Sequence, residues 1–255
     1  KGEPETGADL ADDLERIAAN IGPENIAACI VEPIAGSTGT LVPPKGYLQK
    51  LRDICDKHGI LLIFDEVITG WGRTGSPFAS QAFGVTPDIM TMAKAVTNGV
   101  VPLGAVASRE NIYDTVLDAS PMGAVEFFHG YTYSAIPVSM AAGLAMQNII
   151  EKENLFQRSK DMSPYFLDGL FSLKDIDVIT DIRGYGMMGG IDIHLDERPG
   201  KAGYTCFKKL FEAGLSLKAT GDCLIVAPPF VCETEHIDEI IEKLRTGITN
   251  YMKSK

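Results

Sequence analysis

The sequence predicts an α/β fold, in which a mostly parallel sheet is followed by a smaller α+β part. In the first part, apolar strand-like runs alternate with helical patterns, and the run over 60–65 (ILLIFD) is apolar without alternation. Such a run is typical of a strand buried on both faces of a parallel sheet. From about residue 176 the pattern is that of an α+β unit, so we place a domain boundary near residue 150, between 1–150 and 151–255.

The first expected element is a helix within residues 8–25, where Leu10, Leu14, Ile17 and Ile21 repeat at helical spacing before Gly22-Pro23 ends it. A βαβ unit follows, in which Gly59 closes the helix. The further elements of this part are, in order, a strand over 26–32, a helix over 47–59, strands over 60–65, 88–94 and 104–108, and helices over 109–118 and 137–154.

The second part begins with a helix through Phe171 and then changes in character. The elements expected after it are strands over 175–184 and 187–195, a helix over 205–214, strands over 215–218 and 223–229, and a final helix from about Glu233.

The composition excludes several classes of function. Of the 255 residues, 45% are hydrophobic and 22% are charged, which is too apolar for a disordered chain. The net charge of -11 disfavours binding to nucleic acid or anionic lipid. No apolar run reaches the roughly 18 residues of a membrane span, and the acidic opening does not resemble a signal peptide.

The cysteines and histidines favour neither disulfides nor a metal site. The five cysteines are scattered and form no C-x-x-C pair, and the four histidines include no H-x-x-x-H pair. We therefore expect reduced thiols in a cytoplasmic compartment and no metal.

Asp65 and Glu66 follow the buried strand, at the end where open α/β sheets bind their ligands. A structural role is the plain alternative: such acids cap a neighbouring helix or pair with an arginine such as Arg73. A Walker B role would require G-x-x-x-x-G-K-[ST], which the sequence lacks.

Lys94 follows another apolar strand, and no other charged residue lies between Asp88 and Arg109. We expect its ammonium to point into a site and to be desolvated, so that it loses its proton readily and bonds an aldehyde. A surface lysine is the alternative. Together, Lys94 and Asp65 provide the amine and the acid that pyridoxal phosphate requires for its aldehyde and its ring nitrogen.

Three segments carry a family resemblance: VEPIAGSTG, FDEVITGWGRTGSPFASQAFGVTPDIMTMAKAVTNGVVPLGAV and EFFHGYTYSAIPVSMAAGLA. They resemble class III (omega) aminotransferases, which are pyridoxal-phosphate enzymes of fold type I. The segments VITDIRGYG and KATGDCLIVAPPF resemble the branch that transfers amino groups from omega-amino acids to pyruvate. The resemblance begins at about Ile26 and covers nearly the whole chain.

The resemblance implies roles for individual residues. Asp65 would hold the pyridine nitrogen, Val67 would pack against the ring, and Lys94 would form the Schiff base and carry the proton. Thr132 would reach the cofactor phosphate of a neighbouring subunit, which implies a homodimer or a larger oligomer. Without the resemblance, the plainer interpretation of Thr132 is a turn residue with a polar hydroxyl.

The chain departs from the family pattern at several positions. Gly36-Ser37 stands where relatives that use 2-oxoglutarate have Gly-Glu, and Ile68 stands where they have Gln. Lys218 replaces the arginine that binds the substrate carboxylate, so a two-pronged contact becomes a single flexible one, unless Lys218 is only a solvated strand residue. Ile136 replaces a histidine.

The resemblance implies transamination from an omega-amino acid or amine to pyruvate, giving alanine, with pyridoxal phosphate as cofactor. The alternatives are another donor and acceptor pair, such as 4-aminobutyrate with 2-oxoglutarate, and a non-catalytic fragment or pseudoenzyme. Relatives carry roughly half of their chain upstream, including a phosphate-binding segment. We therefore expect these 255 residues to be the C-terminal part of an aminotransferase, comprising the second half of the large domain and the small domain, and to be incomplete alone.

Overall fold

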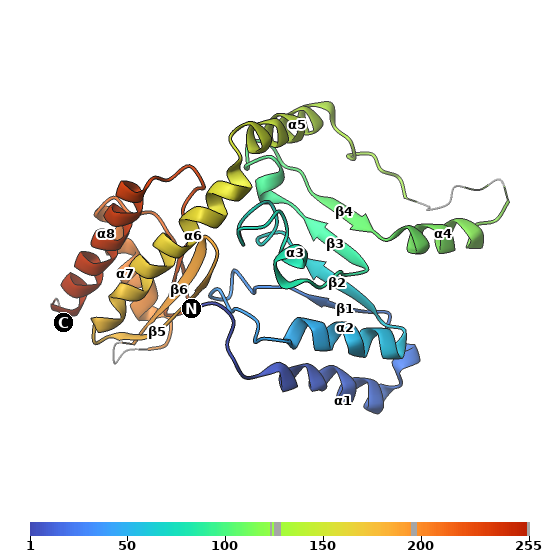
Figure 1. The fold of residues 1–255 in the computed structure, drawn as a ribbon, viewed down its shortest axis with the longest axis horizontal. Coiled ribbons are helices and arrows are strands. Elements are labelled where there is room, and N and C mark those ends of the chain that lie inside the picture. The colour runs from blue at the N-terminus through green and yellow to red at the C-terminus, as the bar shows by residue number, and fades with distance from the viewer. Residues whose placement is uncertain (123, 125–128, 195–197, 254–255) are drawn as a thin grey trace.

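The computed structural model describes residues 1–122, 124, 129–194 and 198–253, which are built around two four-stranded sheets (Figure 1). The first sheet has the strand order β1-β2-β3-β4 and the second has the order β5-β6-β8-β7. A mostly parallel sheet followed by an α+β part confirms the predicted fold class. The division near residue 150 stays a prediction.

The first sheet contains β1 (Ala28–Val31), β2 (Leu61–Asp65), β3 (Ile89–Met92) and β4 (Ala105–Ser108). β1, β2 and β3 run parallel, and β4 is antiparallel to β3. The helices α2 (Tyr47–His58) and α3 (Ala79–Phe83) lie in the connections between the parallel strands. Since the parallel strands end at one edge of the sheet, the residues after Asp65 and Met92 are brought close to each other.

The core of this sheet lies on one face of β2. Leu62 and Phe64 are fully buried and pack with Leu48 and Cys55 of α2. The residues that alternate with them, such as Ile63, are only partly buried. The prediction that β2 is buried on both faces is therefore wrong for the described residues, because the cluster built with α2 covers one face only.

The first helix, α1 (Asp12–Ile21), forms where the spacing predicts it, after a 3-10 turn. Its buried position is Ala18, whereas Leu10, Ile17 and Ile21 are 61%, 50% and 53% exposed. The apolar spacing thus identifies the helix without showing which element covers it.

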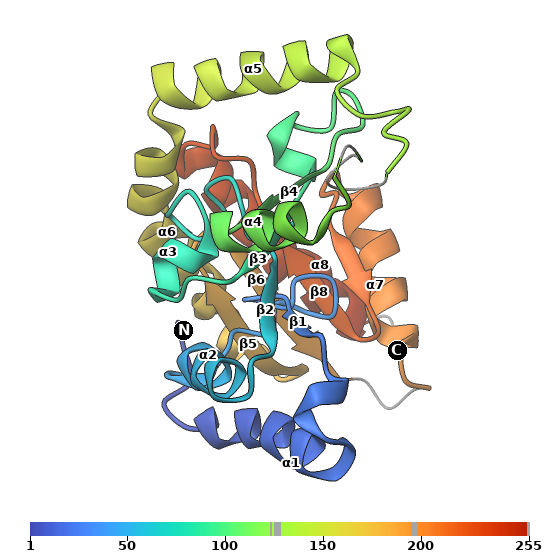
Figure 2. The same cartoon turned by 90° about the vertical axis from the view of Figure 1, so that its right-hand side faces the viewer.

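Three helices follow the first sheet: α4 (Glu110–Ala119), α5 (Pro137–Lys152) and α6 (Leu155–Phe171). Figure 2 shows α5 running across the top of the molecule before the chain turns into α6. Asn154, with a φ of 48°, provides the turn between these two helices.

The second sheet is antiparallel throughout and contains β5 (Ile179–Tyr185), β6 (Met188–Ile193), β7 (Lys218–Thr220) and β8 (Cys223–Val226). It packs with α6, α7 (Lys201–Glu212) and α8 (Thr234–Lys253) around a large apolar cluster that includes Phe166, Ile191 and Leu244. Residue 195, the last of the strand expected over 187–195, lies outside the described residues.

Several boundaries in this part differ from the prediction: β5 begins at Ile179 rather than at residue 175, and β8 ends at Val226 rather than at residue 229. α7 begins at Lys201 rather than at residue 205, because the carboxylate of Asp222 accepts hydrogen bonds from the N–H groups of Gly200 and Gly203. A cap supplied from a later strand leaves no local sequence signal. The strand expected over 215–218 forms at Lys218–Thr220 instead, which leaves residues 215–217 free to line a cavity.

In the described part of the chain, no helix has both the length and the apolar character that crossing a membrane requires. All five cysteines are free thiols, as predicted.

Candidate active site

Asp65 ends β2 at the edge where the parallel strands finish. Its Oδ1 accepts a hydrogen bond from the Val67 N–H at 3.0 Å, and both residues are partly buried. Asp65 is paired in register with Thr91 of β3, whose carbonyl accepts from the Glu66 N–H at 2.9 Å. Lys94 lies three residues beyond Thr91, so the acid and the amine follow the ends of adjacent strands.

Glu66 is fully buried and has a structural role. Its carboxylate accepts hydrogen bonds from the N–H groups of Ala79 (2.7 Å) and Ser80 (2.8 Å), at the start of α3, and from the Thr69 hydroxyl at 2.9 Å. The helix-capping alternative is therefore confirmed for Glu66. Arg73 does not pair with it, because the Arg73 guanidinium donates to backbone carbonyls instead.

Lys94 begins a short 3-10 turn after β3 in a left-handed backbone conformation, with a φ of 50°. Its carbonyl accepts from the N–H groups of Thr97 (3.3 Å) and Gly99 (3.2 Å), which close the turn. Residues other than glycine adopt this conformation at an energetic cost, and such positions concentrate at functional sites. The loop therefore aims the side chain of Lys94 at the expense of backbone strain.

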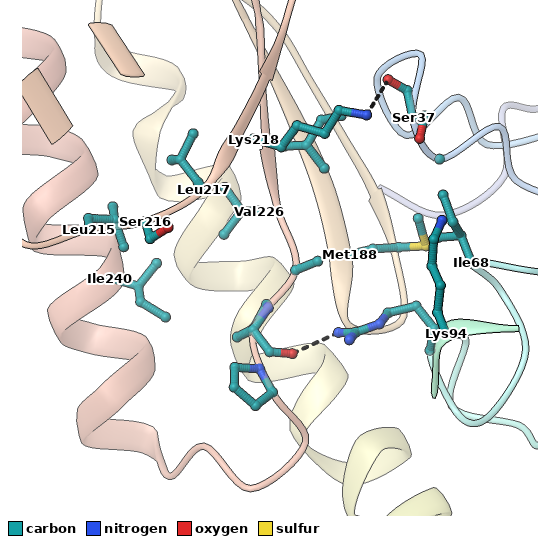
Figure 3. A pocket seen from close by; sticks show the side chains of 16 residues that line it. Ser37, Ile68, Lys94, Met188, Leu215, Ser216, Leu217, Lys218, Val226 and Ile240 are labelled. Carbon is teal, nitrogen blue, oxygen red and sulfur yellow. Dashed lines mark hydrogen bonds between the residues drawn. The ribbon is translucent and has the colours of Figure 1, made fainter. Parts of the chain in front are cut away.

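Lys94 lies where two cavities meet. The first, of about 520 Å³, separates the end of the first sheet from the second sheet (Figure 3). The second, of about 780 Å³, lies between the loop after Lys94 and the start of α5. The lining of the first cavity is formed by Gly36, Ser37, Ile68, Arg73, Lys94, Met188, Leu215, Ser216, Leu217, Lys218, Ile225, Val226, Ala227, Pro228, Pro229 and Ile240.

The sequence leads us to expect a desolvated ammonium at Lys94, and the structure corrects this. Lys94 is exposed, because it stands at the junction of two open cavities rather than inside either of them. Its side chain borders both cavities, and the expectation that they form a functional site stays a prediction.

Lys218 begins β7 on the opposite side of the first cavity from Lys94 (Figure 3). It is exposed, and its Nζ lies 3.5 Å from the Ser37 carbonyl oxygen. Ser37, Ile68 and Lys218, three of the positions at which the chain departs from the family pattern, thus line one cavity together with Lys94.

Gly36 and Ile68 are fitted to each other at the wall of this cavity. A Cβ atom on Gly36 would lie 2.8 Å from Cδ1 and 2.9 Å from Cγ2 of Ile68. Real Cβ contacts are not that short, so the absence of a side chain at position 36 makes room for the branched side chain at position 68.

Arg73 is a lining residue for which the sequence offers no independent physical case. Its Nη1 donates to the carbonyls of Met187 (2.9 Å) and Pro228 (2.7 Å), and its guanidinium lies 4.6 Å from the centre of the Phe230 ring. Burial lowers the pKa of Arg73 to about 10. The sequence suggests Arg73 only as a possible partner of the acids after β2, and in the structure it donates to the two backbone carbonyls instead.

The other predicted site residues lie outside the lining of the first cavity. Asp65 and Val67 line neither cavity, although Ile68, the next residue along the chain, lines the first one. Thr132 is exposed and lines neither cavity, although Tyr133 and Ile136 line the second one. The first three residues of the motif over 126–134 lie outside the described residues.

The sequence also did not identify the apolar wall that the second part of the chain forms through the segment before β7, through β8 and through α8. Leu215, Leu217, Val226 and Ile240 face the cavity from segments more than 120 residues beyond Lys94. The spacing of these residues is typical of an ordinary core, and only the three-dimensional structure places them at the cavity.

The comparison with known proteins decides the family. The family model of aminotransferase class III matches residues 3–248. The chain belongs to the class III aminotransferases. An omega-aminotransferase of Caulobacter vibrioides is 51% identical to this class III chain over 248 residues, which are 96% of the chain and 56% of the relative. The beta-alanine–pyruvate aminotransferase of Pseudomonas aeruginosa is 48% identical, over 92% of the chain and 53% of the relative.

Solved structures agree with this class III assignment. An (S)-enantioselective omega-transaminase from Thermomicrobium roseum superposes with a TM-score of 0.90 at 36% identity, covering 96% of this chain and 56% of the other. An omega transaminase mutant from Pseudomonas jessenii gives a TM-score of 0.92 at 33% identity, with the same coverage. The chain spans about half the length of the curated relatives that it matches.

Proposed function

We propose that the chain takes part in the transfer of an amino group from an omega-amino acid or amine to pyruvate, giving alanine, with pyridoxal phosphate as cofactor. The observation that carries this proposal is Lys94, held by a strained turn at the end of β3 and opening onto a cavity. The similarity to omega-amino acid and beta-alanine aminotransferases supports the choice of substrates.

The residues present fit this cofactor. An aldehyde needs an amine, a pyridine nitrogen needs an acid, and the ends of β2 and β3 supply Lys94 and Asp65 at neighbouring positions. When bound, the cofactor supplies an electron sink for the substrate carbon. Asp65 would hold the proton on the ring nitrogen, and Val67 would pack against the ring. Lys94 would bond the cofactor and, once released, would move a proton at its Nζ.

Lys218 is the proposed contact for the substrate carboxylate. It is exposed at the mouth of the cavity, and among the described residues its Nζ contacts the Ser37 carbonyl at 3.5 Å, a long contact that an incoming carboxylate would replace. An ammonium gives one directed contact where a guanidinium would give two. The apolar wall around Leu217 and Val226 would hold the carbon chain of the substrate.

Thr132 is proposed to serve the cofactor phosphate of a neighbouring subunit, in a homodimer or a larger oligomer. Its exposure and its place outside both cavities support a role towards another chain. The free thiols support a reducing, cytoplasmic setting.

The test is to add pyridoxal phosphate to the full-length protein and to reduce it with borohydride. We expect a visible absorption band and a permanent mass increase on the peptide that contains Lys94. A Lys94→Met variant should lose both, whereas Lys218→Met should keep them. No band in the folded wild type would favour a non-catalytic protein.

The choice of acceptor is tested by comparing pyruvate with 2-oxoglutarate in the loaded enzyme. Pyruvate should give the higher kcat/KM, because Ser37 and Ile68 replace the polar residues of relatives that use 2-oxoglutarate. A strong preference for 2-oxoglutarate would overturn the proposed acceptor.

A further inference from the structure

Arg73 differs from most arginines of the described chain in having no acidic partner. Each of six others forms an ion pair with at least one carboxylate; these are Arg16, Arg52, Arg109, Arg158, Arg183 and Arg245. Arg73 forms no ion pair with any described carboxylate, and its hydrogen bonds go to two backbone carbonyls. Among the described residues, its charge therefore has no carboxylate counter-ion.

The cavity that Arg73 lines is cationic. Its lining contains Arg73, Lys94 and Lys218 and no aspartate or glutamate, and most of the remaining residues are apolar. Apolar walls weaken the screening by water, so the field of a charge extends further into such a space.

Arg73 is partly buried, and a charge removed from water without a counter-ion destabilises a folded protein. Burial lowers the pKa of Arg73 to about 10, which reflects this cost of desolvation. An anion entering the cavity would recover part of that cost, whereas a neutral ligand of the same shape would not.

We propose that Arg73 is a specificity-determining residue, whose unpaired charge makes this cavity prefer substrates that carry a carboxylate. The inference rests on the proposed function for the identity of the cavity as the substrate site. Arg73 acts at a distance as a fixed charge, held by Met187, Pro228 and the ring of Phe230. Lys218 is the exposed partner that makes the direct contact at the mouth.

Propionate and propionamide are suitable probes, because they have the same size, neither reacts with an amine, and only propionate is charged. The measurement is the ratio of their dissociation constants, by calorimetry on the full-length protein loaded with pyridoxal phosphate. The variants are Arg73→Gln, which keeps amide donors without the charge, and Arg73→Lys, which keeps the charge. Arg158→Gln is the matched control. Like Arg73, Arg158 donates to backbone carbonyls, in its case those of residues 230–232, but it does not line the cavity.

The preference for propionate should fall roughly tenfold in Arg73→Gln, which corresponds to about 1.4 kcal/mol. It should be kept in Arg73→Lys and be unchanged in Arg158→Gln. A merely structural role would weaken both ligands equally and leave the ratio constant. An unchanged ratio in Arg73→Gln, or an equal fall in Arg158→Gln, overturns the proposal.

If Arg73→Gln does not fold, Lys218→Met keeps the inference falsifiable. Because Arg73 remains in that variant, a preference for propionate should persist, and its complete loss overturns the proposal. Binding of the probes requires no turnover. A preference for propionate without borohydride trapping on Lys94 would therefore refute the proposed function and leave the charge selection of the cavity standing.

Discussion

Lys94 combines a proposed chemical role with an unfavourable backbone conformation. A φ of 50° brings the Cβ of an L-residue close to neighbouring backbone atoms, at a cost that glycine avoids. The strain is retained in the turn between β3 and Gly99, whose N–H is bonded to the Lys94 carbonyl. Any side chain at position 94 therefore lowers the stability of the fold relative to glycine.

This conflict predicts the order of two variants. Lys94→Gly should be more stable than Lys94→Ala by about 1 kcal/mol, because the Cβ of alanine is strained in the left-handed backbone conformation and glycine has no Cβ. Urea denaturation of the cofactor-free protein measures the difference. Ala145→Gly, in α5, is the control and should show the opposite sign, since a helix favours alanine. Equal stability of the two Lys94 variants would contradict a strained turn.

The neighbouring acids Asp65 and Glu66 differ in burial and in hydrogen bonding. Glu66 is fully buried and accepts three hydrogen bonds, whereas Asp65 is partly buried and accepts one, from the Val67 N–H. Stability should therefore depend on the second acid and chemistry on the first.

Glu66→Gln should destabilise the fold by about 2–3 kcal/mol, because its NH₂ group would face N–H or O–H donors of the α3 cap. Asp65→Asn should change the free energy of unfolding by less than about 1 kcal/mol and lower the rate of amino transfer by at least about 100-fold. Denaturation and single-turnover kinetics on both variants check this. Similar stability losses in the two would refute the division of tasks.

At the scale of elements, the sequence predicts most of the first sheet correctly. The βαβ unit, both later strands and the Gly59 cap, with its φ of 68°, follow from local spacing and from glycine chemistry. The errors concern burial and caps that depend on distant residues. The open face of β2 and the start of α7 at Lys201 are decided by α2 and by Asp222, which no local pattern includes.

Asp88 joins three segments of the first part of the chain. Its carboxylate accepts from Arg52 of α2 and from the Leu62 N–H of β2, and Arg109, which precedes α4, lies 3.4 Å away. Burial raises the pKa of Asp88, but the Leu62 N–H and the Arg52 guanidinium outweigh it and hold the pKa below its ordinary value.

The stabilisation from Asp88 should depend on pH. Because its folded pKa is lower than its unfolded value of about 3.9, the contribution is complete above that pH and is lost as the pH falls through the folded pKa. Asp88→Asn should cost about 3 kcal/mol at pH 7 and clearly less below about pH 3. Asp56→Asn, which removes an exposed partner of the same Arg52, should cost under about 1 kcal/mol at either pH. A loss from Asp88→Asn that is independent of pH would contradict this account.

At the scale of the whole molecule, polar contacts join the loops of the first sheet to the second part of the chain. The Arg183 Nε donates to the Gly39 carbonyl at 2.6 Å, and the buried Ser159 hydroxyl donates to the Gly72 carbonyl at 2.6 Å. The first contact fixes the loop that carries Ser37, and hence one wall of the cavity.

Gly39→Ala should disturb this junction. Gly39 has a φ of 131°, and an added Cβ would lie 2.7 Å from the Arg183 Nη2 and 3.2 Å from the Cys223 Sγ. We expect a loss of about 2–3 kcal/mol. Gly59→Ala meets no atom within 4 Å and should cost only the backbone strain of about 1 kcal/mol. Thermal unfolding of both variants gives the comparison, and equal losses would contradict a tight junction at Gly39.

The candidate site could be predicted only in part, because its members come from distant segments. Asp65 and Lys94 are visible in the sequence, since each is a charged residue directly after an apolar strand. Ser37, Lys218 and the apolar wall meet Lys94 only through the packing of the two sheets, which a linear pattern does not encode. The individual roles of Asp65, Val67, Lys94, Thr132 and Lys218 stay predictions.

The fit of Gly36 against Ile68 restricts how this cavity can be redesigned. Since the space of one residue is taken by the other, substitutions at the two positions will not be additive, and a double-mutant cycle between them should show a large interaction energy. Enlarging position 36 requires trimming position 68 in the same step. Libraries that vary one of them at a time will therefore miss the functional combinations.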